Sequence, residues 1–273
     1  MSHFLLIDGK FQDQTGSHLA AFLKDQLLFE ERICSIRNQL PFLGNHLQRM
    51  ELQFKLHHRA IPSLLHHEGT DLKRQIERLL MKNKFYKSAV IQLYFIENND
   101  SLSVIIDAEP VATTSYLLNK NGLKVAGYNK LTKGISALST LELGSNPYWK
   151  IINSDPEKQI VDELLLMNHQ QTYLEAPRKN LYVVTGNTIS TPSPKTGAFI
   201  DVSQDHIRKT SLQMGLNFQF VEQLKEDDLF EADELFLANS ITGIEWIKAF
   251  KHKRYFNKVI QKLNGNFNRN LLI

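Results

Sequence analysis

A chain of 273 residues and 31.5 kDa can form one large domain or two modest ones, and it can bury a core without disulfides or structural metals. Hydrophobic residues make up 42% of the chain and charged residues 22%, which excludes collagen-like, low-complexity and intrinsically disordered proteins. The 32 Lys and Arg residues against 29 Asp and Glu leave a net charge of +3, too small to indicate a nucleic-acid or membrane partner. The single cysteine, Cys34, excludes an intramolecular disulfide and any site built from several thiolates.

The sequence contains no recognisable targeting signal. Residues 1–14 lack a basic segment followed by a long apolar run, so they do not resemble a signal peptide. No stretch reaches the roughly 18 consecutive apolar residues that a transmembrane helix needs. With one cysteine and no such segment, we expect a cytoplasmic protein without a membrane partner.

The first half of the chain mixes strand and helix patterns. Apolar alternation and turn residues predict strands, and apolar residues at three- and four-residue intervals predict helices. The expected elements are a hairpin over 4–11, strands between 25 and 36, helices over 43–54 and 70–80, a hairpin of 88–96 and 102–106, and a strand over 116–118.

The second half is predicted to be richer in strands. A polar stretch with Gly144 and Pro147 is followed by short apolar runs, and Gly215 suits the end of a helix. The expected elements are strands over 161–167, 173–175, 181–184, 188–190, 218–221 and 234–238, a helix over about 204–214, and a terminal helical region that begins at 243–250.

Local motifs for common kinds of site are weak or missing. The histidine pairs His57-His58 and His66-His67 lack the spacing of zinc ligands, so we expect no metal site. The basic and aromatic run 248–255 is short, and a solvated helix end explains it better than nucleic-acid binding. Neither a Gly-rich phosphate loop nor the nucleophile elbow G-x-S-x-G occurs. Composition and periodicity therefore indicate a soluble α+β protein and no specific function.

Several segments, taken in order, resemble the class IV aminotransferases. These are the fold-type IV pyridoxal-phosphate enzymes, which include branched-chain aminotransferase, D-amino-acid aminotransferase and aminodeoxychorismate lyase. The similar segments cover nearly the whole chain: 8–11, 25–31, 40–50, 161–166, 173–175, 180–184, Thr191-Pro192 with Gly197, and 231–237.

The resemblance implies an α+β, two-domain, D-amino-acid aminotransferase-like architecture. We expect a smaller N-terminal α/β domain over 1–118, a linker over 119–128 and a larger C-terminal domain over 129–273. The family also implies a homodimer whose cleft faces the partner, and an amino or oxo acid as substrate in an active member.

Three positions match residues with which this family holds its cofactor. Pyridoxal phosphate needs a lysine for an imine bond, a carboxylate at its ring nitrogen and donors for its phosphate. By resemblance, Arg49 is the phosphate-binding arginine, Glu175 is the ring-nitrogen carboxylate, and Ser240 lies near the hydroxyl that binds the phosphate.

Other positions depart from the family pattern. The cofactor lysine of the family precedes the aspartate that matches Asp162 by roughly twenty residues, which places Glu142 at the lysine position. The serines of the family's S-S-N motif are Arg178 and Lys179 here. The turn that offers backbone N–H groups to the phosphate reads 201–204, so that Asp201 puts a negative charge where an anion is expected.

These departures leave two main hypotheses. The first is a degenerate member, a pseudoenzyme that keeps the fold but lacks the standard chemistry. The second is an active pyridoxal-phosphate enzyme with a displaced lysine, for which Lys150, Lys133 and Lys130 are the candidates. A weaker third hypothesis is that Arg49, Arg178 and Lys179 bind another anionic metabolite.

Overall fold

The computed structural model describes residues 3–13, 27–98 and 101–271. These residues form two compact units, Met1–Ser115 and Tyr116–Ile273. The chain thus divides after Ser115 rather than after residue 118, and residues 123–128, which were expected in a linker, lie in a strand. The described helices include none that is both long and apolar enough to span a membrane.

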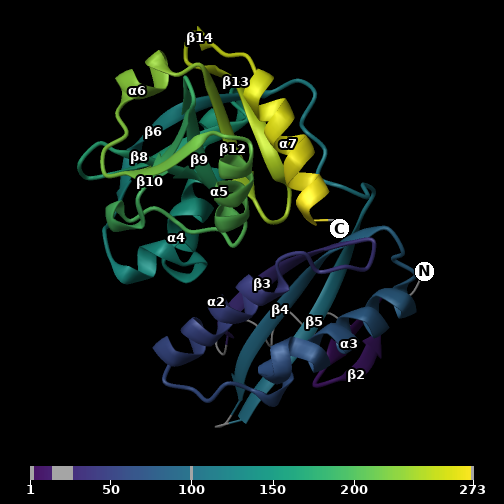
Figure 1. Cartoon of the computed structure of the whole chain (residues 1–273). Helices are drawn as coiled ribbons and strands as arrows, with labels where there is room; N and C mark the ends of the chain where they lie inside the picture. Colours follow the sequence, from purple (N-terminus) through teal and green to yellow (C-terminus); the bar gives the residue numbers. More distant parts are fainter. Residues whose placement is uncertain (1–2, 14–26, 99–100, 272–273) are drawn as a thin grey trace. The chain divides into compact units, whose positions relative to one another are not determined.

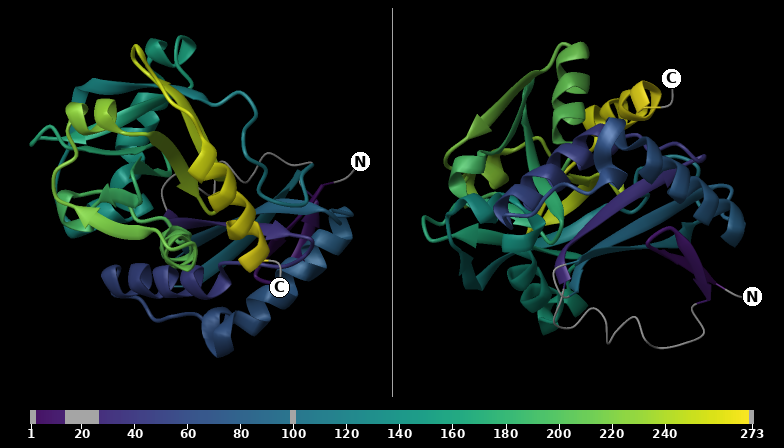
Figure 2. Two further views of the ribbon diagram at one scale, coloured as in Figure 1. Left: turned by 45° about the horizontal axis from the view of Figure 1, so that its top comes forward. Right: turned by 90° about the horizontal axis from the view of Figure 1, so that it is seen from below.

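The first unit is an antiparallel sheet covered by helices on one face (Figures 1 and 2). The strand order is β2-β1-β5-β4-β3. The elements are β1 (Phe4–Ile7), β2 (Lys10–Asp13), β3 (Leu27–Ile36), α2 (Leu43–Leu56), η1 (Ser63–Leu65), α3 (His66–Asn83), β4 (Ser88–Asn98) and β5 (Ser101–Val111).

The core of this unit follows from the apolar periodicities. Met50 and Phe54, one turn apart on α2, and Leu72, Ile76 and Leu79 on α3 are fully buried. They pack against the inward residues of β3, β4 and β5 in one hydrophobic cluster. The helices expected over 43–54 and 70–80 are therefore confirmed, and each is a little longer than expected.

The second unit is built on a larger mixed sheet. The order is β11-β10-β9-β12-β13-β6-β7-β8, and β8 also pairs with β9, which closes part of the sheet on itself. The strands are β6 (Leu123–Lys133), β7 (Glu163–Asn168), β8 (Tyr173–Ala176), β9 (Lys179–Thr185), β10 (Thr188–Pro192), β11 (Asn217–Val221), β12 (Glu234–Asn239), β13 (Gly243–Phe250) and β14 (Lys253–Arg254).

Helices surround this sheet. Figure 1 shows α5 and α7 next to one another, and the two helices are in contact. The helices are η2 (Ala137–Thr140), α4 (Glu142–Asn153), η3 (Pro156–Gln159), η4 (Pro194–Thr196), α5 (Gln204–Gln213), α6 (Glu226–Glu231) and α7 (Lys258–Leu271).

Two expected elements of the second unit are wrong. Residues 116–118 form no strand, and 243–250 is strand β13 rather than the start of a helix. The β13 run pairs with β12 through a turn at Gly243, whose φ of +74° suits glycine, and helix α7 begins only at Lys258. The apolar spacing of 243–250 did not distinguish a helix from a strand, and pairing with β12 makes this run a strand.

The polar stretch around Pro147 is a helix. Ser145, Trp149 and Ile152 are buried on one face of α4, so tertiary packing outweighs the turn-forming residues. Gly144 permits α4 to lie against η2, because a Cβ at this position would stand 2.2 Å from the carbonyl oxygen of Leu138.

Candidate functional site

The centre of the second unit holds a buried carboxylate, Glu175 on β8. Its Oε1 accepts hydrogen bonds from Lys133 Nζ at 2.8 Å and from Trp149 Nε1 at 2.9 Å. Its Oε2 accepts the backbone N–H of Phe199 at 2.5 Å. The side chains of Glu175 and Lys133 have no solvent exposure, and Trp149 is 1% exposed. Both carboxylate oxygens of Glu175 therefore accept hydrogen bonds from groups of this chain.

Lys133 reaches Glu175 from the end of β6. A bulge between Tyr128 and Thr132 shifts the pairing of β6 with β7 just before this lysine. Burial lowers the pKa of the Lys133 amine, and the charge of Glu175 offsets this effect only in part. A lysine and a glutamate that are both out of water satisfy one another as an ion pair.

The three candidate lysines have different surroundings. Lys150 lies on α4 and is exposed. Lys130 is about half exposed and pairs with Asp155, 2.9 Å away. Of these three lysines, which all lie in the described part of the chain, Lys133 is the one that contacts Glu175.

Glu142 is the first residue of α4, and it is mostly buried. Its Oε1 accepts a hydrogen bond from Arg178 Nε at 2.6 Å. The guanidinium of Arg178 also lies 6.0 Å from the ring centre of Trp149. Glu142 and Arg178, at which the sequence suggested departures from the family pattern, thus neutralise one another beside the indole.

Asp201 lies three residues before Gln204, the first residue of α5. Its Oδ1 accepts from Ser203 N at 2.8 Å and from Ser203 Oγ at 2.6 Å, while its Oδ2 accepts from Ser240 Oγ at 3.2 Å. Burial, and then the charge of Asp201, raise the pKa of the Tyr182 hydroxyl well above its ordinary value. The structure therefore brings Asp201 and Ser240 together around one buried negative charge.

Arg49 lies on α2 in the first unit, where Glu31 of β3 binds it. Arg49 Nε is 3.2 and 3.1 Å from the two carboxylate oxygens, and Nη2 donates to Oε1. His46 Nδ1 lies 2.5 Å from the same Oε1. Burial alone would raise the pKa of Glu31, but Arg49 and His46 outweigh burial and hold it below its ordinary value.

This cluster predicts a pH dependence of stability. A carboxyl with a lower pKa in the folded chain stabilises the fold above its unfolded pKa, and the contribution is lost as pH falls through the folded pKa. We expect the free energy of unfolding in urea to decline below about pH 4.5. Glu31→Gln should lower this free energy by about 3 kcal/mol at pH 7, and the stability of the variant should decline less steeply with falling pH than that of the wild type.

The matched control for this prediction is Asp71→Asn, which breaks an exposed pair with Arg74 in the same unit. That variant should cost less than about 1 kcal/mol. Equal costs for the two variants would show that Glu31 is not the buried partner of Arg49.

Lys179 is likewise paired. Its Nζ lies 2.9 Å from Glu163 and 2.8 Å from Glu245. Burial alone would lower its pKa, but the two carboxylates outweigh burial and raise it. The three cations of the anionic-metabolite hypothesis, Arg49, Arg178 and Lys179, each have a carboxylate partner in this chain.

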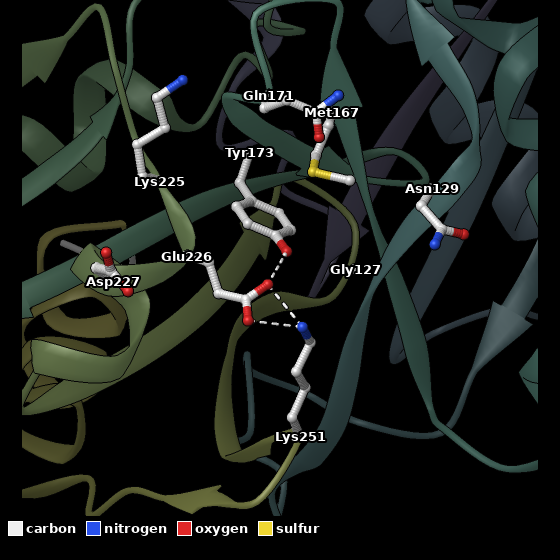
Figure 3. Close-up of a pocket in the computed structure, with 9 residues that line it drawn as sticks. All are labelled: Gly127, Asn129, Met167, Gln171, Tyr173, Lys225, Glu226, Asp227 and Lys251. Atoms are coloured by element: carbon white, nitrogen blue, oxygen red, sulfur yellow. Dashed lines mark hydrogen bonds and ion pairs between the residues drawn. The ribbon is translucent and has the colours of Figure 1, made fainter.

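A separate cavity of about 520 Å³ opens elsewhere in the second unit (Figure 3). Figure 3 shows Glu226 between Tyr173 and Lys251: Tyr173 Oη donates at 3.1 Å and Lys251 Nζ donates at 2.6 Å to Glu226 Oε2. Burial and the charge of Glu226 raise the pKa of Tyr173. The charges at the centre of this cavity neutralise one another, and its lining includes none of the candidate catalytic or cofactor-binding residues from the sequence.

The sequence pointed to Glu175, Asp201, Ser240, Arg49 and Glu142, but it missed several of their partners. Trp149, Ser203, Glu31 and His46 were not singled out. The spacing of Ser145, Trp149 and Ile152 could have revealed the buried face of α4.

The comparisons with known proteins agree with this fold. Residues 29–250 match the family model for amino-transferase class IV, and the chain therefore belongs to that family. No curated protein matches the sequence.

Solved structures of aminotransferases are similar over nearly the whole chain. A branched-chain aminotransferase from Thermoproteus uzoniensis with norvaline has 16% identity and a TM-score of 0.84, with 100% of this chain and 95% of that chain covered. The branched-chain amino acid aminotransferase from Escherichia coli has 16% identity and a TM-score of 0.79, with 96% and 92% covered. A hypothetical aminotransferase from Mycobacterium tuberculosis in its PLP-bound form has 13% identity and a TM-score of 0.81, with 98% and 99% covered. The expected fold-type IV architecture is confirmed.

Proposed function

We propose that this chain is a non-catalytic member of the class IV aminotransferase family, which does not carry out pyridoxal-phosphate chemistry. The observation that carries the proposal is the state of Glu175, the position that resembles the ring-nitrogen carboxylate. Lys133, Trp149 and the N–H of Phe199 already occupy its two oxygens, and it has no exposed surface. A pyridinium ring would have to displace or share these contacts in order to reach the carboxylate.

The residues at the other cofactor positions do not fit the cofactor either. At the position that resembles the cofactor lysine, Glu142 has no amine with which to form an imine, and it pairs with Arg178. The charge of Arg49 is compensated by Glu31. Asp201 would repel a phosphate at the position of the phosphate-binding turn. We therefore derive no reaction step through pyridoxal phosphate.

The alternative is an active enzyme that uses a displaced lysine. One observation favours it, because Lys133 contacts Glu175 and burial lowers the pKa of its amine, as a nucleophilic lysine requires. The same contact opposes it, since Lys133 would have to leave Glu175 before any ring could enter. Lys150, the first of the three lysines that the sequence analysis named, is exposed on α4 and has less support.

Amino-group exchange between an amino acid and a 2-oxo acid distinguishes the two functions. With added pyridoxal phosphate, we expect the wild-type chain to exchange amino groups no faster than the cofactor does without protein. Glu142→Lys should also be inactive, because Asp201 and the Glu175 pair remain. Exchange by the wild type that disappears in Lys133→Ala would contradict the proposal and establish the alternative.

The remaining expectations are part of the same proposal. A homodimer is implied by the family resemblance, and a cytoplasmic location is supported by the single cysteine in the sequence. An amino or oxo acid is the partner that the alternative requires. The norvaline in the Thermoproteus uzoniensis structure belongs to that protein alone and does not identify a substrate for this chain.

A further inference from the structure

The start of α5 is arranged around a negative charge that belongs to the chain itself. Three donors converge on the Asp201 carboxylate: the N–H of Ser203, the hydroxyl of Ser203 and the hydroxyl of Ser240. Ser240 comes from the end of β12 and Ser203 from the start of α5, so two elements contribute. All three residues are at most 5% exposed.

The backbone next to this carboxylate is fixed from the other side. Asn180 on β9 accepts the N–H of Asp201 at 3.0 Å and donates to the carbonyl of Phe199 at 2.5 Å. Asp201 has no positive φ, so a smaller side chain at this position would meet no left-handed backbone strain. The bonds of Asn180 hold the backbone of Phe199 and Asp201 from the neighbouring strand, independently of the Asp201 carboxylate.

The same donors would suit an external anion. Backbone N–H groups at the beginning of a helix, together with hydroxyls, bind phosphate and carboxylate oxygens. A carboxylate attached to the chain has a high effective concentration at these donors, so a free anion competes poorly with it. A phosphate dianion beside Asp201 would also meet a like charge in a buried place.

We propose that Asp201 is a built-in anion, which occupies the anion pocket formed by Ser203, Ser240 and the start of α5 and so excludes phosphate and phosphate esters from it. The proposal deepens the proposed function, since it gives one physical cause for the loss of a phosphate-bearing cofactor. It can also fail separately, because it concerns the anion pocket and not the chemistry at Glu175.

Inorganic phosphate tests this proposal on the full chain. Asp201→Ala removes the carboxylate and leaves the three donors, and Asp201→Asn keeps the shape without the charge. In calorimetric titration, we expect Asp201→Ala to bind one phosphate per chain, whereas the wild type and Asp201→Asn show no saturable heat. At phosphate about five times its Kd, the Tm of Asp201→Ala should rise by about 3 °C more than that of the wild type.

A further variant connects the binding to the pocket. Adding Ser240→Ala to Asp201→Ala should weaken phosphate binding by about tenfold, since one hydrogen bond to a charged group is lost. If Asp201→Ala does not fold, Asp201→Ser takes its place, because its hydroxyl can accept the N–H of Ser203 while the charge is removed.

The outcomes separate this inference from the proposed function. Two results would overturn the built-in anion: the wild type binds phosphate as well as Asp201→Ala does, or Asp201→Ala and Asp201→Ser both fold but bind no phosphate. Neither result would bear on the hydrogen bonds of Glu175. Amino-group exchange by the wild type would instead overturn the proposed function.

Discussion

Glu175→Gln is expected to lower the free energy of unfolding by about 3–5 kcal/mol. The glutamine keeps the shape but has one acceptor oxygen, so only one side of the site, Trp149 Nε1 or the N–H of Phe199, retains its acceptor, and the amide nitrogen faces the other donor. Lys133 loses its counter-charge and stays in a place without solvent exposure. The measurement is equilibrium unfolding in urea, followed by tryptophan fluorescence and circular dichroism.

The double variant Lys133→Met with Glu175→Gln provides the control. It removes both charges and keeps a long side chain at 133, so we expect it to be more stable than Glu175→Gln alone, with a remaining cost of about 1–3 kcal/mol from the buried donor that faces the glutamine amide nitrogen. The double-mutant cycle then isolates the energy of the Lys133–Glu175 pair. If Glu175→Gln alone cost less than about 1 kcal/mol, Lys133 would have access to another partner or to water, and the proposed function would lose its main support.

Trp149→Ala is expected to cost about 3–5 kcal/mol, as for other fully buried aromatic residues. The indole is 1% exposed, packs edge-on against Phe199 with 4.9 Å between ring centres, and donates to Glu175. Trp149→Phe keeps most of the ring and removes the N–H, so it should cost about 1–2 kcal/mol. Urea unfolding of both variants measures these costs.

The control for Trp149 lies on the same helix. Ile151 is 52% exposed, and Ile151→Ala should change the stability by no more than about 0.5 kcal/mol. A cost below about 1 kcal/mol for Trp149→Ala would mean that the indole is not packed beside Glu175 in solution. In that case, space for a ligand would exist where we propose that there is none.

Much of the fold could be predicted from the sequence because its signals are local. The helical spacing around Met50 and Ile76 and the apolar run ending at Met167 correspond to α2, α3 and β7. The failures come from segments whose structure depends on distant partners. Gly243–Phe250 is a strand because β12 and β6 flank it, and α4 is a helix because its buried face outweighs Pro147.

The sequence suggested positions for a candidate site but not the contacts that these residues make. Resemblance pointed to Glu175, Arg49 and Asp201, but Lys133 and Trp149 are 42 and 26 residues away from Glu175 in the chain. No spacing rule connects residues that far apart, since the closed sheet and α4 bring them together. The sequence could suggest which positions to examine, whereas the internal partner of each one required the structure.

The central claim is tested most directly by uptake of pyridoxal phosphate by the wild-type chain. The protein is mixed with the cofactor, reduced with borohydride and desalted, and its intact mass, absorbance and modified peptides are then measured. We expect no saturable adduct at Lys130, Lys133 or Lys150, and no more retained cofactor than on an unrelated protein of similar lysine content. One cofactor per chain, attached to one of these lysines, would contradict the account.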